Sequence, residues 1–179
     1  MERCHSQICA AVSLLSLGLA SIASSSAWAA NAGCDAGRWP LSAVQTRFGG
    51  TLPAVGNGDA LPTLGASVLV NLNLQGEVAF PHAPGRASNA SPAYAAVIKL
   101  GAQPAGIYQV TVSGGAWVDV AENSDLAKPS GFVQPKDCAG VDKSIRFRTN
   151  GGPLAIQISG SYVKTIKVEA VREIGRAHV

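Results

Sequence analysis

Four oxygen-bearing side chains near the middle of the chain form its densest group of potential metal ligands. Asp119, Glu122, Asn123 and Asp125 lie within seven residues. Calcium takes six to eight oxygen ligands, and a loop of this composition can supply several of them. Asp and Asn are also common in ordinary tight turns, and the spacing lacks an EF-hand pattern. The sequence therefore leaves two interpretations open: a calcium site at these residues, or a turn without metal.

An aromatic side chain, Trp117, stands directly before this group. If Ala116, Val118 and Val120 face the core, the alternation of a β-strand sends Trp117 and Asp119 to the opposite face. An exposed indole beside a carboxylate is suited to stacking on a sugar or a peptide. If both faces of the strand are covered, Trp117 is instead a core residue. Trp117 and Asp119 are the candidate ligand-binding residues, with burial of the indole as the alternative.

Histidine is scarce, and this limits the enzyme classes that the chain can support. His5 lies in an apolar leader and His178 in the last residues, which leaves His82 in a proline-flanked loop. One histidine cannot supply the two-histidine, one-carboxylate site of an iron dioxygenase, and no G-x-S-x-G motif provides a serine nucleophile. We therefore expect His82 to be a loop residue.

Carboxylates offer no clear catalytic pair. A glycosidase needs two of them facing one cleft, and the candidates here are Glu77, Asp119, Glu122, Asp125, Asp137, Asp142 and Glu169. Most are expected at turns or on outward faces, and no two stand apart from the others. The sequence thus predicts no catalytic residue. A carboxylate-based hydrolase, or a dioxygenase, remains the alternative.

Basic residues recur on the later strands. Arg146 and Arg148 flank Phe147, and Lys164 and Lys167 follow further along the chain. Together they could form a stripe that meets an acidic partner or a polysaccharide. The other interpretation is a solvated sheet face whose charges discourage edge-to-edge pairing.

Cysteine usage indicates an oxidising compartment. Cys4 and Cys9 lie in the leader, so Cys34 and Cys138 remain as a pair. An even pair in an exported chain is expected to form a disulfide. It would close a loop of about 104 residues, which on the chain-entropy model contributes roughly 4 to 5 kcal/mol. A metal pair and a free thiol are the alternatives, although no ligand-spaced His or Cys supports a metal.

The elements that must position these residues are short β-strands. From residue 66 onward, apolar residues recur with a period of two. Expected strands cover 67–74, 77–80, 94–100, 107–113, 116–121, 130–133, 144–149, 154–159 and 165–171, with Gly114-Gly115 making a tight hairpin. Residues 30–65 are less regular, and their prolines indicate an arm or an edge strand. About eight strands with one apolar face each predict an all-β, antiparallel two-sheet sandwich, with jelly-roll connections as one arrangement and a small closed barrel as the rival.

The ends of the chain are expected to lie outside this domain. A short positive start, an apolar stretch and small residues ending Ala27-Trp28-Ala29 predict a signal peptide over residues 1–29. Lipoprotein processing at Cys34 is the rival, but Asn31 stands where a lipobox has Leu. The last residues, 173–179, resemble a translated sequencing adapter. Residues 66–172 would then form the sandwich, in one domain with the 30–65 arm.

Composition agrees with a small apolar domain. The chain has 179 residues, of which 47% are hydrophobic and 14% charged, with a net charge of +3. Charge this mild and scattered does not indicate nucleic acid as a partner, and the leader has the length of a signal peptide rather than of a transmembrane segment.

The strand sequences carry a resemblance. Gly106-Ile-Tyr108-Gln-Val110-Thr-Val112-Ser-Gly114, the following Ala116–Val120 segment, and the last two strands resemble small exported bacterial β-sandwich proteins without assigned function. They are also similar to bacterial pre-peptidase C-terminal domains, the accessory jelly rolls of secreted hydrolases, which share a G-x-Y-x-V-x-V-x-G strand. The resemblance covers residues 94–171 and implies a sandwich with an accessory role, although we expect no catalytic domain beside it in this chain.

The sequence therefore predicts a non-enzymatic binding or accessory module, periplasmic or extracellular, for a carbohydrate, peptide or envelope partner. A purely structural envelope protein is the remaining alternative.

Overall fold

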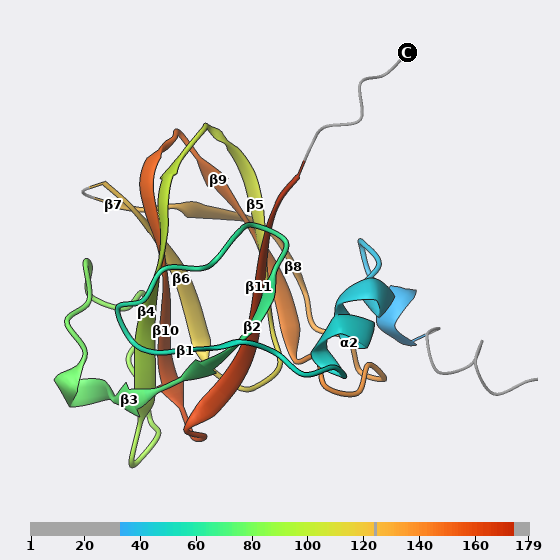
Figure 1. Ribbon diagram of the computed structural model, residues 1–179, viewed down its shortest axis with the longest axis horizontal. Coiled ribbons are helices and arrows are strands. Elements are labelled where there is room, and N and C mark those ends of the chain that lie inside the picture. The colour runs from blue at the N-terminus through green and yellow to red at the C-terminus, as the bar shows by residue number, and fades with distance from the viewer. Residues whose placement is uncertain (1–32, 124, 174–179) are drawn as a thin grey trace, which may run out of the picture.

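The computed structural model describes residues 33–123 and 125–173, which form two facing β-sheets (Figure 1). One sheet has six strands, in the spatial order β1 (Ala54–Val55), β2 (Ser67–Asn71), β11 (Thr165–Glu173), β5 (Gly106–Val112), β9 (Lys143–Thr149) and β8 (Lys128–Val133). The other has five, in the order β3 (Asn73–Leu74), β4 (Tyr94–Gln103), β10 (Gly152–Ser161), β6 (Trp117–Glu122) and β7 (Asp125–Leu126). Within the sheets, only β1 and β2 pair in parallel. The expected all-β, two-sheet sandwich is confirmed.

The core lies between the sheets and is built by the predicted alternation. On β5, Tyr108, Val110 and Val112 point inward and are buried, and Phe147 on the neighbouring β9 meets them from the same sheet. Ile156 of β10 faces them from the other sheet and is fully buried. Each such side chain contributes roughly 1.5 to 3 kcal/mol by leaving water.

Three local predictions about strands were wrong. The expected strand over 67–74 is divided, because the chain leaves the six-stranded sheet after β2 and enters the five-stranded sheet at β3. No strand covers 77–80; a 3₁₀ turn, Gln75–Glu77, leads into an irregular loop. The Gly114-Gly115 turn is not a hairpin either, since β5 and β6 belong to different sheets.

The first part of the N-terminal segment, which comprises residues 33–65, packs on the outside of the six-stranded sheet. It contains a short helix, α2 (Ser42–Phe48), visible beside the sandwich in Figure 1. Trp39 and Phe48 form a second buried cluster with the disulfide between Cys34 and Cys138, as the cysteine pair predicts. The sulfur of Cys34 is thereby used within the domain, which leaves none for the thioether that lipidation requires.

A carboxylate fixes the chain just before α2. Asp35 Oδ1 accepts hydrogen bonds from the backbone N–H groups of Leu41 (2.9 Å) and Ser42 (3.0 Å). These bonds favour the ionised carboxylate, and the backbone bond from Ser42 is the main reason that the pKa of Asp35 lies below its ordinary value.

An ion pair joins the helix to the sheet. Glu169 on β11 is 2% exposed, and its two oxygens accept bonds of 2.6 Å each from the Arg47 guanidinium of α2. Ser67 Oγ donates a further bond of 2.5 Å to the same carboxylate. The hydrogen bond to Glu169 is the main cause that raises the pKa of Arg47. Because the carboxylate is buried, the arginine is required to compensate its charge.

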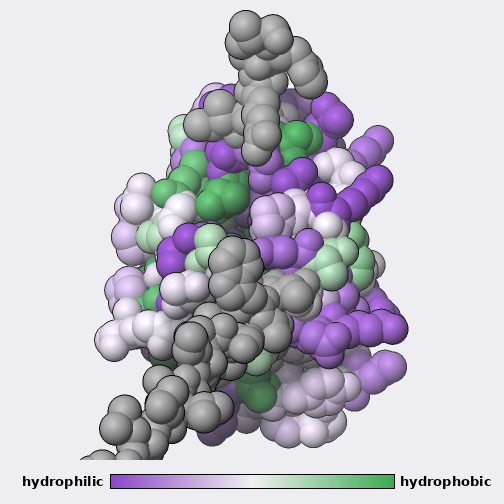
Figure 2. Space-filling model, turned by 90° about the vertical axis from the view of Figure 1, so that its right-hand side faces the viewer, coloured by the Kyte–Doolittle hydropathy of each residue, from purple (hydrophilic) through white to green (hydrophobic). Residues whose placement is uncertain are grey.

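Hydrophilic side chains cover much of the face that carries the N-terminal segment, and hydrophobic ones form small separate patches (Figure 2). No helix in the described part of the chain is long and apolar enough to cross a membrane. The expected signal peptide, 1–29, lies outside the described residues, as do residues 174–179 of the adapter-like tail. Glu173 of that tail is described: it ends β11 and binds Arg146 at 3.0 Å.

Candidate functional site

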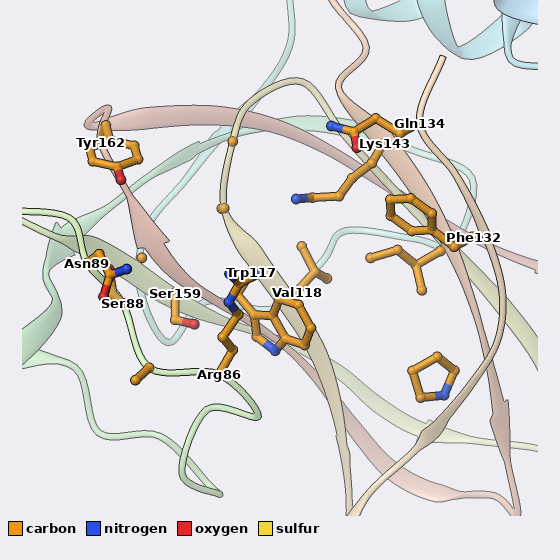
Figure 3. A pocket seen from close by; sticks show the side chains of 16 residues that line it. Arg86, Ser88, Asn89, Trp117, Val118, Phe132, Gln134, Lys143, Ser159 and Tyr162 are labelled. Carbon is orange, nitrogen blue, oxygen red and sulfur yellow. The ribbon is translucent and has the colours of Figure 1, made fainter. Parts of the chain in front are cut away.

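Aromatic side chains gather around one cleft at an open side of the sandwich. Of the five large hydrophobic side chains exposed among the described residues, three line this cleft: Trp117, Phe132 and Tyr162, at 38%, 53% and 69% exposure. The cleft has a volume of about 520 Å³, which is within the range of small-molecule and peptide sites. Figure 3 shows Trp117 near its centre, with Tyr162 and Phe132 on opposite sides.

Strand alternation explains why Trp117 faces outward. Ala116, Val118 and Val120 belong to the main core, so the intervening side chains of β6 point to the outer face of the five-stranded sheet. The indole Nε1 of Trp117 donates a hydrogen bond of 2.9 Å to Asp119 Oδ1, two residues along the same face. This bond fixes the ring's polar edge and leaves part of its apolar surface in the cleft.

Asp119 holds a loop against this strand. It is only 7% exposed, and its second oxygen accepts a bond of 2.9 Å from the Gly85 backbone N–H. A Cβ atom at position 85 would lie 3.0 Å from Asp119 Oδ1 and 3.2 Å from Trp117 Nε1, so glycine permits the close approach. The next residue, Arg86, places its guanidinium 5.8 Å from the centre of the Trp117 ring. Such a contact between a cation and an indole is favourable.

The same loop has a second anchor on β10. Gln157, the cross-strand partner of Asp119, is 1% exposed; it accepts a bond from the His82 N–H (3.0 Å) and donates one to the His82 carbonyl (3.2 Å). Further along, Ser88 packs closely against Gly160, where a Cβ would lie 2.9 Å from the serine hydroxyl. The cleft wall formed by Arg86, Ser88 and Asn89 is therefore held by buried side chains of two strands.

The opposite wall is the inner face of β8. Phe132 is paired with the core residue Ile145, and Pro129 with the core residue Phe147, yet both β8 residues are exposed. On its outer face the same strand is covered, because Trp39 packs on Gly131. The inner side of β8 thus faces the cleft, whereas its outer side is covered at Gly131 and Val133.

The charged side chains that line the cleft are both cationic. Arg86 stands on the loop side and Lys143 on the β9 side, with Gln134 nearby (Figure 3). Lys143 Nζ lies 3.4 Å from Asp142 Oδ2, so its charge is partly compensated. Among the described residues no carboxylate lies within ion-pair distance of Arg86.

The four residues of the proposed calcium site are not brought together around a cation. Glu122 turns inward and accepts bonds from the backbone N–H groups of Asn150 (2.5 Å) and Gly151 (2.8 Å), whereas Asp119 lies on the outer face. Asn123 has a left-handed backbone conformation in the β6–β7 hairpin, and Asp125 is exposed. Within residues 33–123 and 125–173, no three His, Cys, Asp or Glu side chains are grouped to hold a metal ion.

The basic residues do not form one free stripe. Arg146 stacks over Trp39 at 4.1 Å from the ring centre and binds Gln109 at 3.0 Å. Lys167 donates to the Phe48 carbonyl, and Lys164 lies over the ring of Tyr94 at 5.8 Å. Arg148 is exposed. The contacts of Arg146 and Lys167 fasten the N-terminal segment to the sheet.

Sequence reasoning did not identify several residues of the cleft. It missed Arg86, Phe132, Lys143 and Tyr162, and it missed the anchoring role of Gln157. Tyr162 had a signal, since an aromatic residue in a Gly-Ser turn has no reason to be buried there. Phe132 carried no such signal, because its place in the alternation of β8 is that of a core residue.

Comparison of the chain with family models, with curated proteins and with solved structures finds no match in any of the three. The site is accordingly defined by its own geometry. It is a partly apolar cleft lined by a fixed indole and two cations, and none of the described residues that line it is a carboxylate.

Proposed function

We propose that this protein is an exported, non-enzymatic binding module whose ligand occupies the Trp117 cleft. The observation that carries the proposal is the convergence of Trp117, Phe132 and Tyr162 on one cavity. Exposed apolar surface that is concentrated in a concave site is typical of ligand binding, whereas scattered exposed residues need no explanation.

Two further features support the proposal. Buried polar side chains orient the cleft wall: Asp119 binds both the indole and the loop, and Gln157 binds the loop's backbone. Burying a carboxylate costs free energy of desolvation, and a surface loop that positions no ligand does not need such an anchor. The disulfide is consistent with an oxidising compartment, and with the leader it supports export to the periplasm or beyond. An accessory role like that of pre-peptidase C-terminal domains is compatible with this proposal and rests on the strand resemblance alone.

The test compares ligand binding by the wild type and by Trp117→Ala on glycan and peptide arrays. Leu74→Ala is the matched control, because Leu74 is also an exposed hydrophobic residue but does not line the cleft. We expect Leu74→Ala to bind like the wild type and Trp117→Ala to lose about tenfold or more in affinity, as for a central interface residue.

Two results would count against the proposal. If Trp117→Ala, still folded by circular dichroism, binds as well as the wild type, the cleft is not the binding site. If the wild type binds nothing on either array, the structural envelope protein becomes the better interpretation.

A further inference from the structure

The five-stranded sheet leaves part of its last long strand unpaired. On the side away from β10, β6 pairs with β7 only at Ala121 and Glu122, and Ala127 adds one bond, from its N–H to the Val120 carbonyl (2.8 Å). From Trp117, where β6 begins, to Asp119, no residue in the described parts of the chain pairs with this side of the strand. The free segment runs along the cleft, since Trp117 and Val118 line it.

The backbone of this segment is directed toward the cleft. In an antiparallel ladder the N–H and C=O of one residue point to the same side, and neighbouring residues alternate. Since Val120 uses its carbonyl on the β7 side, Val118 also points its N–H and C=O to that side. The described residues provide no partner for these two groups. They form a donor and an acceptor ready for a further strand.

The opposite sheet extends into the space that such a strand would cover. Phe132 and Pro129 of β8 face inward like core residues but remain exposed, because no strand of the five-stranded sheet lies over them. A strand added beside β6, in line with β7, would pack one face of its side chains on Phe132. Its other face would lie beside Trp117 and Arg86.

We propose that the cleft binds an extended acidic peptide, which adds a strand to the free edge of β6. The inference rests on the proposed function and specifies its ligand. The peptide would pair with Val118, place apolar side chains over Phe132, and direct the carboxylates of its other face toward Arg86. Charge complementarity selects the acidic class, because the charged side chains lining the cleft, Arg86 and Lys143, are both cations.

The length of the free edge sets the size of the peptide. Four consecutive residues, from Gly115 to Val118, line the cleft at the start of β6, and at about 3.3 Å per residue this corresponds to roughly 13 Å. A hexapeptide spans this length with one residue to spare at each end.

The probe is an array of hexapeptides in which every second position is Glu or Lys and the others are Val, Leu, Phe or Tyr. We expect Glu peptides to bind about tenfold or more tightly than their Lys counterparts. Methylating the alternate amide nitrogens that face β6 should abolish binding, since the side chains are kept and the ladder donors are lost. Arg86→Glu should weaken the Glu peptides about tenfold, whereas Arg148→Glu, on an exposed strand position outside the cleft, should not.

Hydrogen exchange gives a readout specific to strand addition. The amide of Val118 should exchange about tenfold or more slowly when the best Glu peptide is bound. Unchanged exchange at Val118, equal binding of N-methylated peptides, or a preference for Lys peptides would each overturn the inference.

The two levels of the proposal fail separately. If oligosaccharides such as cellohexaose or oligogalacturonate bind and lose affinity in Trp117→Ala, while no hexapeptide binds, the cleft is a binding site but not a strand acceptor. If no ligand of either class is weakened by Trp117→Ala, the proposed function itself is wrong.

Discussion

Removing the bond between Cys34 and Cys138 should cost the protein much of its stability. The bond spans a sequence separation of 104 residues. On the chain-entropy model a loop of this length lowers the entropy of the unfolded chain by about 16 cal/mol/K, or about 4.7 kcal/mol at 25 °C. The free energy of unfolding of domains of this size is about 5 to 15 kcal/mol. The double variant Cys34→Ser/Cys138→Ser should therefore lose between a third and nearly all of its free energy of unfolding.

Urea unfolding followed by circular dichroism measures this loss and its origin. If the bond acts on the unfolded chain, the double variant exposes more surface on unfolding, so its m value rises while its stability falls. If the bond only fastens the N-terminal segment to its cluster with Trp39, breaking the bond releases that segment in the folded state. Unfolding then exposes less additional surface, so the m value falls instead. Each single variant should lose about as much as the double, because either one opens the loop. A double variant within about 1 kcal/mol of the wild type, or two alkylatable thiols in the unreduced protein, would refute the reasoning.

Three further perturbations test other parts of the structure. Arg47→Met leaves a buried carboxylate without its cation, so the free energy of unfolding should fall by about 2 to 3 kcal/mol, against less than about 0.5 for the exposed Arg148→Met; a loss no larger than the control's would show that water compensates the carboxylate. Gly85→Ala forces a Cβ into contacts of 3.0 and 3.2 Å and should cost about 1 to 3 kcal/mol, whereas Gly76→Ala, which meets nothing within 4 Å, should be nearly neutral; equal effects would mean that the loop yields freely. Burial raises the pKa of Tyr108 above its ordinary value, so the unfolded chain releases this proton first and stability should fall as pH rises above about 10; Tyr108→Phe should remove that part of the pH dependence, and an unchanged slope would refute it.

Alternation in the sequence was enough to predict the layers of this fold. The strands at 94–100, 107–113, 144–149, 154–159 and 165–171 all appear, each with its apolar face inward. This works because a period of two fixes which side chains share a face, whatever the order of the strands. The pairing order was not predictable in the same way. Gly114-Gly115 has the composition of a hairpin turn, yet it connects the two sheets.

The N-terminal segment shows a second limit. Its prolines indicated an arm or an edge strand, and β1 is such a strand, but α2 was not expected. A helix of seven residues has little intrinsic stability and too few turns for a clear period. It is held by tertiary contacts: Phe48 is buried in the disulfide cluster, and Arg47 binds the buried Glu169. Those partners are distant in sequence, so no local pattern could reveal them.

The sequence left two alternatives for Trp117: an exposed indole on the outer face of its strand, or a core residue. Alternation places the indole on the outer face of β6, and only the packing of the 81–92 loop decides how much of that face is covered. The loop covers Asp119 and leaves Trp117 partly exposed, because Gly85 comes close enough to bind the carboxylate. The decisive contacts join residues 34 positions apart. They depend on a single loop glycine, about which the periodicity of the strands gives no information.

The cleft itself arises from a mismatch between the two sheets. Phe132 pairs with the core residue Ile145 and has the phase of a core residue, but it is 53% exposed because the five-stranded sheet ends before covering it. If one more strand lay beside β6, Phe132 would be buried and the backbone groups of Val118 would be paired. A side chain that is in phase for the core yet exposed therefore marks where a strand is missing. Since the same cleft also holds the fixed indole and the two cations, the peptide that we propose would complete the sandwich at this position.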